Sequence, residues 1–123
     1  MNFNQFTIKA QEAVQQAQQI ATDKGHQAIE SGHLLKGLLD NDEQVIPFLF
    51  KKAGVNLRNI HAVLDQVLNS YPKVSGAQVY LGSSGQQVLN KAMSLMSEMK
   101  DEFVSIEHLV LALLSANDQV SRM

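Results

Sequence analysis

The sequence predicts an all-α domain built from two helical repeats related by a pseudo-two-fold axis, and three observations support this fold class. Apolar residues recur at the spacing of one helix face through most of the 123 residues. No segment shows the apolar-polar alternation of a half-buried strand. A shift of 75 residues places positions 10–46 on positions 85–121 without a gap.

The internal repeat rests on identities and on similar apolar residues. The identical pairs under this shift are Gln11/Gln86, Ala17/Ala92, His33/His108, Leu34/Leu109, Leu38/Leu113, Leu39/Leu114, Gln44/Gln119 and Val45/Val120. Apolar positions that recur in this way serve the same inward-facing role twice. Two similar helical units packed about a pseudo-two-fold axis follow from this pattern.

In the first repeat, helix ends are marked by capping and stop residues. The first helix is expected to follow Thr7, a residue type that caps helices, and to end at Gly25. Ser31 is expected to cap the second helix, which runs into the polar stretch 40–43, interpreted as a solvated loop. A short third helix begins near the proline at position 47 and ends at Gly54.

The later helices follow the same signals. Asn56 is expected to cap a fourth helix that ends before the proline at position 72. Residues 72–83 lack a helical period and are interpreted as a linker, with Val79-Tyr80-Leu81 packed back on the body. Ser84 is expected to open a fifth helix and Ser105 to cap a sixth.

These elements predict one domain over residues 1–123. Repeat one spans about residues 7–71, the linker 72–83 and repeat two 84–123. Under the same shift Met123 corresponds to Phe48, so repeat two lacks counterparts of residues 49–71. We therefore expect repeat two to be truncated at its C-terminal end, and the natural domain to extend past Met123.

Composition argues against several partner classes. Ten basic and twelve acidic residues give a net charge of −2, which provides no electrostatic footprint for nucleic acid or for an anionic membrane. The absence of cysteine excludes disulfides, thiolate zinc sites and thiol nucleophiles. Neither a signal peptide nor an apolar run of roughly 20 residues is visible, so a soluble cytoplasmic domain is expected.

An enzyme is disfavoured by the absence of catalytic motifs. The sequence contains no GxxxxGK[ST] phosphate loop and no GxGxxG, HExxH or GxSxG pattern. No two of the four histidines lie at i,i+4, so no metal site is predicted. His33 and His108 hold the same place in each repeat and are interpreted as structural imidazoles at a helix junction. We expect neither a catalytic site nor a bound cofactor in this chain, which leaves a stand-alone helical enzyme unsupported.

The methionines of the fifth helix admit two interpretations. Their spacing of three residues is typical of a buried helix face. The repeat offers an alternative, because some apolar residues of repeat two replace polar ones of repeat one. These pairs are Met93 for Gln18, Met99 for Lys24 and Leu111 for Lys36. If the polar residues are exposed, their apolar counterparts form a surface patch of the kind that binds peptides.

Two long segments resemble a known family. FTIKAQEAVQQAQQIATDKGHQAIESGHLLKGLLDND, followed by FLFKKAGVNL, resembles the N-terminal domain of Clp/Hsp-hundred AAA+ unfoldases, and FVSIEHLVLALL fits its second unit. The spacer PKVSGAQVYLGSSGQQVL looks more like the ClpB-type disaggregases than the ClpA and ClpC types. ClpA and ClpC types usually show Gly-His-Asn-Tyr-Ile-Gly-Thr-Glu-His in both units, where this chain has GHQAIESGH and KDEFVSIEH.

The resemblance implies a substrate-recruiting domain that binds exposed hydrophobic segments of unfolded or aggregated proteins. It would deliver them to the pore of a homohexamer that cooperates with an Hsp-seventy-type chaperone. ATP and magnesium would bind only in ATPase domains outside this chain. The alternative is an adaptor-docking domain of a ClpA- or ClpC-type unfoldase.

The resemblance also carries over functional positions. A threonine before the first helix and an acidic pair near the second loop match Thr7, Asp101 and Glu107. Purely structural roles are the alternative, with Thr7 as a cap, Glu107 in a first helical turn and Asp101 in a loop.

A family substrate groove beside the first and fifth helices would place Val14 and Leu89 near the client. The repeat comparison adds Met93 to this predicted substrate-binding set.

Overall fold

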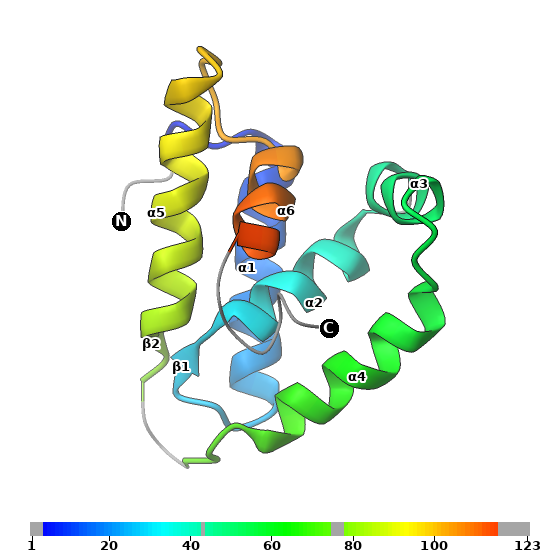
Figure 1. The fold of residues 1–123 in the computed structure, drawn as a ribbon. Helices are drawn as coiled ribbons and strands as arrows, with labels where there is room; N and C mark the ends of the chain where they lie inside the picture. Colours follow the sequence, from blue (N-terminus) through cyan, green and yellow to red (C-terminus); the bar gives the residue numbers. More distant parts are fainter. Residues whose placement is uncertain (1–3, 43, 75–77, 116–123) are drawn as a thin grey trace.

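The structure is a computed structural model that describes residues 4–42, 44–74 and 78–115. Over these residues the chain forms six α-helices and two short strands (Figure 1). The helices are α1 (Ile8–Asp23), α2 (Ser31–Asn41), α3 (Val45–Lys52), α4 (Leu57–Ser70), α5 (Ser83–Glu98) and α6 (Ile106–Ser115). The strands are β1 (Ala28–Ile29) and β2 (Tyr80–Leu81). The predicted helical fold class is confirmed.

Some of the predicted segments fall outside this description. Residues 75–77 of the predicted linker and 116–123 of the predicted second repeat are not among the described residues. None of the helices in the described part of the chain is long and apolar enough to cross a membrane.

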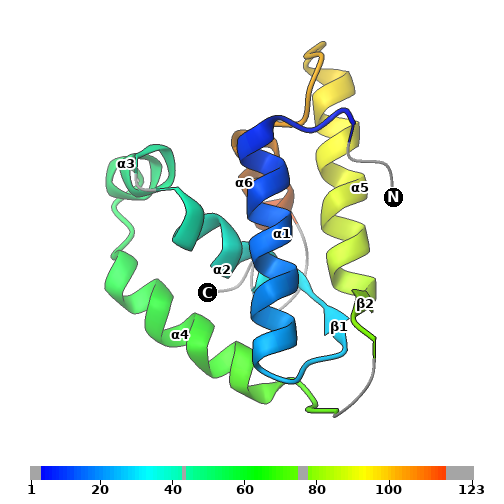
Figure 2. The same ribbon diagram turned by 180° about the vertical axis from the view of Figure 1, so that it is seen from behind.

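Helix α1 occupies the middle of the molecule, with α5 on one side of it and α4 on the other (Figures 1 and 2). It packs along α2, and α5 packs along α6 in the same way. The α1–α2 contact is close at Gly37, where a Cβ atom would overlap the carbonyl oxygen of Ala13. The missing side chain therefore lets the two backbones approach each other.

Extended segments connect the two repeats reciprocally. Strand β1 pairs in parallel with β2, so that Ala28 lies opposite Tyr80 and Ile29 opposite Leu81. An isolated parallel bridge joins Phe6 to Val104, which is the same pairing moved by 75 residues with the two repeats exchanged. Each repeat thus pairs with the extended segment that precedes the first helix of the other repeat. This exchange is the relation that a pseudo-two-fold axis requires, and it fixes Tyr80 and Leu81 of the predicted linker as a strand.

Of the five predicted caps, two are present and two are wrong, while Ser105 directly precedes α6 with its Oγ 3.0 Å from His108 Nδ1. The Thr7 side chain accepts a hydrogen bond from the Ala10 N–H at 3.1 Å, and Asn56 caps α4 through its side chain. Ser31 and Ser84 were expected as caps, but α2 and α5 follow Glu30 and Gly82 instead. Ser84 Oγ accepts a hydrogen bond from the Ser31 N–H at 2.9 Å, so the two serines link the repeats.

The helix stops are also related by the repeat. Gly25 follows α1 with φ +74° and Gly54 follows α3 with φ +75°, as their predicted role as helix stops requires. At the position equivalent to Gly25, Lys100 after α5 has φ +59°. The backbone turn is therefore repeated although the glycine is not.

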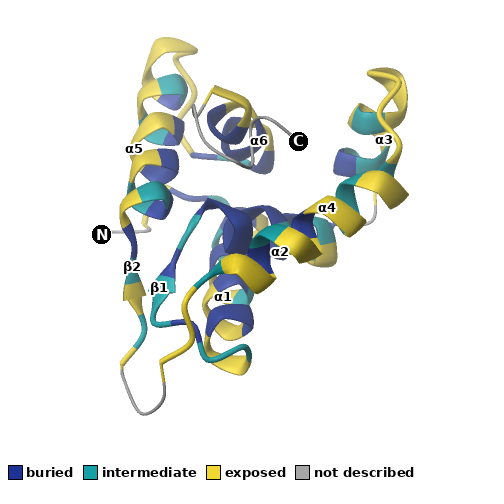
Figure 3. Cartoon of the chain, turned by 60° about the horizontal axis from the view of Figure 1, so that its bottom comes forward, coloured by how far each residue is buried: buried dark blue, intermediate teal, exposed yellow. Residues whose placement is uncertain are grey.

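The core lies where α1, α2, α5 and α6 meet, and α3 and α4 are mostly exposed (Figure 3). The buried residues of α1 recur at the spacing of one helix face, as the apolar periodicity predicts, and are Ala10, Ala13, Val14, Ala17, Ile20 and Ala21. Helix α4 contributes Leu64 and Leu68 to the core, and α3 contributes Ile46.

The polar stretch after α2 differs from the prediction. Asp42 is only 1% exposed, and its Oδ2 accepts a hydrogen bond from the Ile46 N–H at 2.6 Å. This carboxylate satisfies a backbone donor in the first turn of α3, which explains why it is buried rather than solvated.

Candidate functional site

An apolar groove lies between α3 and α6 and encloses about 380 Å³. Its lining residues are Leu49, Phe50, Ala53 and Val55 on one side, and Glu107, Val110, Leu111 and Leu114 on the other. Leu111 and Leu114 are 41% and 62% exposed, and Leu49 and Val55 are also exposed. Large aliphatic side chains gathered at such a surface are typical of a site that binds apolar segments of a partner.

A smaller pocket of about 220 Å³ adjoins the groove at the start of α6. Its lining residues are Thr7, Lys9, Val45, Ser105, Ile106 and Glu107. Glu107 lines both hollows, so its exposed carboxylate stands at the boundary between them. The structure therefore brings together Thr7 and Glu107, two of the predicted substrate-binding residues.

Asp101, which the family resemblance grouped with Thr7 and Glu107, lines neither of these two pockets and contacts a histidine instead. Its Oδ2 lies 2.9 Å from His108 Nε2. The Ser105 N–H donates to His108 Nδ1 at 2.9 Å, so in the neutral ring the proton sits on Nε2 and is donated to Asp101. Asp101 thereby fixes the orientation of a buried imidazole in the first turn of α6.

His33 makes the same junction in repeat one. Its Nδ1 accepts a hydrogen bond from the Glu30 N–H at 2.9 Å, and its Nε2 lies 2.8 Å from His26 Nδ1. Both His33 and His108 are buried, and their geometry agrees with the interpretation as structural imidazoles. No group of three or more potential metal-ligating side chains occurs within the part of the chain that the structure describes.

The remaining predicted residues lie in or against the core. Leu89 is fully buried in α5, and Val14 is 8% exposed in α1, where it lines a shallow hollow with Gln11, Gln15 and Gln18. Met93 is half-buried and packs against the core. Because these side chains fill the interior, Leu89 has no surface to offer a client, and the structure does not join the three to the α3–α6 groove.

The repeat comparison located exposed apolar residues better than the helix spacing did. Met99 and Leu111 are exposed, as their polar counterparts in repeat one suggested, although only Leu111 lines the groove. Sequence reasoning missed Leu49, Phe50 and Val55 of α3 and the turn after it. It was also wrong about Leu114, which the repeat placed facing inward with Leu39 but which is 62% exposed and lines the groove. Residues 45–50 are almost all apolar, and one buried helix face cannot cover them all. This excess of apolar residues is the sequence signal that indicates an exposed apolar surface on this helix.

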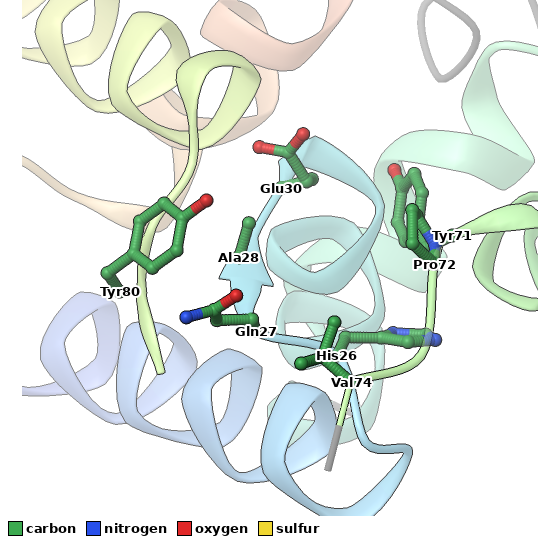
Figure 4. A pocket seen from close by; sticks show the side chains of 8 residues that line it. All are labelled: His26, Gln27, Ala28, Glu30, Tyr71, Pro72, Val74 and Tyr80. Carbon is green, nitrogen blue, oxygen red and sulfur yellow. The ribbon is translucent and has the colours of Figure 1, made fainter. Parts of the chain in front are cut away.

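A further pocket of about 290 Å³ lies beside β1 and β2 and next to the segment that follows α4. Figure 4 shows its lining, with Tyr80 on one side, Tyr71 and Pro72 on the other, and Glu30 at its upper edge. His26, Gln27, Ala28 and Val74 complete it. The side chains are of mixed character, unlike the apolar lining of the α3–α6 groove.

Two helical repeats with reciprocally paired entry segments define a two-repeat helical domain. A family model, the Clp repeat N-terminal domain, matches residues 5–123. The chain belongs to this family.

Curated relatives agree with this assignment. The chain is 48% identical over 121 residues, or 98% of its length, to the chaperone protein ClpB of Bacteroides thetaiotaomicron. It is 43% identical over its whole length to the chaperone protein ClpB of Porphyromonas gingivalis. The chain spans 14% of the length of each of these relatives.

Solved structures share the fold. The N-terminal domain of Hsp104 from Candida albicans superposes with a TM-score of 0.83 at 23% identity, covering 91% of this chain and 75% of that one. The N-terminal domain of the ClpV1 ATPase from E. coli gives 0.86 at 21% identity, with coverages of 96% and 72%. A ClpV N-domain in complex with a VipB peptide gives 0.76 at 20% identity, with coverages of 95% and 72%.

Proposed function

We propose that this chain is the substrate-recruiting N-terminal domain of a ClpB-like, ATP-dependent protein disaggregase. It binds exposed hydrophobic segments of unfolded or aggregated proteins. The observation that supports this most is the α3–α6 groove, where Leu111 and Leu114 remain exposed opposite Leu49 and Val55. Burying such side chains against an apolar client removes area from water at about 25 cal/mol per Å².

Polar residues at the groove edge complete the proposed binding surface. An extended client exposes backbone N–H groups, and the Glu107 carboxylate between the two pockets is placed to accept hydrogen bonds from them. Thr7 lines the adjoining pocket. Because the patch is small and ordering a flexible client is unfavourable, we expect a dissociation constant near the micromolar range or weaker.

The proposal also covers the ATP-driven parts of the whole protein and its assembly. ATP and magnesium would act in domains outside this chain, in a homohexamer that works with an Hsp-seventy-type chaperone. A second function, docking of a defined partner peptide, is favoured by the ClpV N-domain that was solved with a VipB peptide.

Binding of a labelled, permanently unfolded model protein to the 123-residue chain, followed by fluorescence anisotropy, tests the proposal. Leu111→Ser and Leu114→Ser should each weaken binding at least threefold while the far-UV circular dichroism stays unchanged. Val63→Ser is the matched control, because Val63 is as exposed as Leu111 but lies on α4 and does not line the groove. If the folded groove variants bind as the parent does, the groove is not the client site.

Measuring the binding of folded adaptor proteins to the same chain, in parallel with the unfolded protein, separates the two functions. Retention of folded adaptors without any binding of the unfolded chain would favour partner docking over client recruitment.

A further inference from the structure

Two histidine junctions of similar geometry, 75 residues apart, differ in the side chain that faces the Nε2 atom. In repeat one, His33 Nε2 lies 2.8 Å from the ring nitrogen Nδ1 of His26. In repeat two, His108 Nε2 lies 2.9 Å from a carboxylate oxygen of Asp101, the residue equivalent to His26. The other ring nitrogen accepts a backbone N–H at 2.9 Å in both junctions. An imidazole in repeat one thus replaces an acid in repeat two.

The hydrogen bonds fix the protons of the repeat-one pair. Because the Glu30 N–H donates to His33 Nδ1, the proton of the neutral His33 ring is on Nε2 and is donated to His26 Nδ1. The His26 proton is then on Nε2, an atom that is buried without a hydrogen-bond partner among the described residues. A further proton on either ring would place a donor against a donor, so this pair is built for two neutral imidazoles.

The surroundings also disfavour a positive charge. His33 is fully buried and His26 is 2% exposed. Lys24 after α1 and Lys73 after α4 both face His26 with positive charge. Glu30 lines the adjacent pocket with Tyr71 and Tyr80, but its Oε1 has no hydrogen-bond partner among the described residues. Burial, then the His26 ring and Lys24, lower the pKa of His33 from 6.5 to about 4, and burial lowers the pKa of His26.

Tyr71 connects this pair to α4. Its ring centroid lies 5.0 Å from that of His33 and 5.6 Å from that of His26, and its hydroxyl accepts the Gly32 N–H at 3.3 Å. The cluster of His26, His33 and Tyr71 therefore joins the C-terminal end of α4 to the N-terminal end of α2. Figure 4 shows His26 and Tyr71 together beside the pocket at this junction.

We propose that the His26–His33–Tyr71 cluster is an acid-sensitive latch: protonation of the histidine pair releases the end of α4 from α2, whereas the His108–Asp101 junction stays closed. In repeat two, Asp101 accepts from the charged ring as well as from the neutral one. A second proton on His108 Nδ1 would face the Ser105 N–H, as in repeat one, but Ser105 Oγ at 3.0 Å is also within reach as an acceptor, and the Asp101 carboxylate remains paired with Nε2. Release of α4 would uncover Leu64 and Leu68, which are fully buried in the structure.

The latch is a property of the fold and does not depend on the proposed function, although uncovered apolar surface would add to client binding in acid. The size of the expected change in latch opening follows from proton binding. If the open state binds the His33 proton with the ordinary affinity, the opening equilibrium rises about 20-fold between pH 7 and pH 5.

Amide hydrogen exchange of the 123-residue chain tests the latch, with rates corrected for the intrinsic effect of pH. The reporters are the N–H groups of Glu30 and Ser105, which occupy equivalent places and donate to the equivalent nitrogens of His33 and His108. We expect the opening equilibrium at Glu30 to rise about 20-fold from pH 7 to pH 5 and that at Ser105 to change less than threefold. Equal responses at the two sites would overturn the proposal.

Two reciprocal variants exchange the junctions. His26→Asp places the acid of repeat two in repeat one and should abolish the rise at Glu30, whereas Asp101→His should transfer it to Ser105. An unchanged rise at Glu30 in His26→Asp contradicts the latch. Ring nitrogen NMR of the unmodified chain decides the matter even if a variant misfolds. Both His26 and His33 should carry their proton on Nε2 and titrate below pH 6.5, and ordinary titration of both would refute the proposal.

Discussion

Leu89 and Leu114 are leucines of the same repeat, and the structure predicts opposite consequences for the same substitution. Leu89 is 0% exposed and Leu114 is 62% exposed. Leu→Ala removes the equivalent of three methylenes, or about 2.4 kcal/mol at 0.8 kcal/mol each when the side chain is fully buried. For Leu89 a cavity adds to this, so Leu89→Ala should lower the free energy of unfolding by about 3 to 4 kcal/mol.

For Leu114 only the buried 38% of that transfer energy is lost. The loss is therefore about 0.9 kcal/mol at most, and no cavity forms because the site is open to solvent. Leu114→Ala should instead weaken client binding, since this side chain lines the α3–α6 groove.

Urea denaturation followed by far-UV circular dichroism measures both effects. With a slope of about 1.5 kcal/mol per molar urea, Leu89→Ala should lower the midpoint by about 2 M or more, and Leu114→Ala by about 0.6 M or less. Equal losses of stability in the two variants, or a loss below about 1 kcal/mol for Leu89→Ala, would refute the assignment of Leu89 to the core.

Two further predictions concern acid and backbone packing. The free energy of unfolding should fall by about 2 kcal/mol between pH 7 and pH 5, because His33 has a pKa of about 4 when folded and 6.5 when unfolded, so the unfolded state binds the proton first. Urea titrations at both pH values measure this loss, and an unchanged midpoint contradicts it. Gly37→Ala should lower the free energy of unfolding by about 2 kcal/mol, since its Cβ would overlap the Ala13 carbonyl oxygen. Gly54→Ala, at φ +75° with open space, should lower it by about 1 kcal/mol, and thermal unfolding that ranks the two glycine variants in the opposite order would contradict this reasoning.

The local signals of the sequence were sufficient for the helices. Apolar periodicity identified the buried face of α1, and Gly25 and Gly54 marked helix ends because each has the left-handed backbone that glycine adopts readily. Thr7 and Asn56 were identified as caps for a similar reason, since a cap hydrogen bond joins residues only two or three positions apart. The repeat then identified the exposed site of Leu111 through its polar counterpart Lys36.

The contacts between repeats depended on the tertiary structure. Serine is a residue type that commonly caps helices, but Ser31 and Ser84 lie 53 residues apart and hydrogen-bond to each other instead. The residues of β1 and β2 are too few to show alternation, so their pairing was decided by the pseudo-two-fold packing.

The features of the candidate site also divide into those that the sequence determined and those that the tertiary structure decided. The sequence by itself determined the helices, their repeat and the family resemblance, because these depend on neighbours along the chain. Only the tertiary structure decided that α3 faces α6 across a groove, that Leu89 is buried while Leu114 is exposed, and that Asp101 and His26 hold equivalent imidazoles. Each of these depends on which helix faces cover one another, and helices of similar amphipathic pattern do not specify that choice locally.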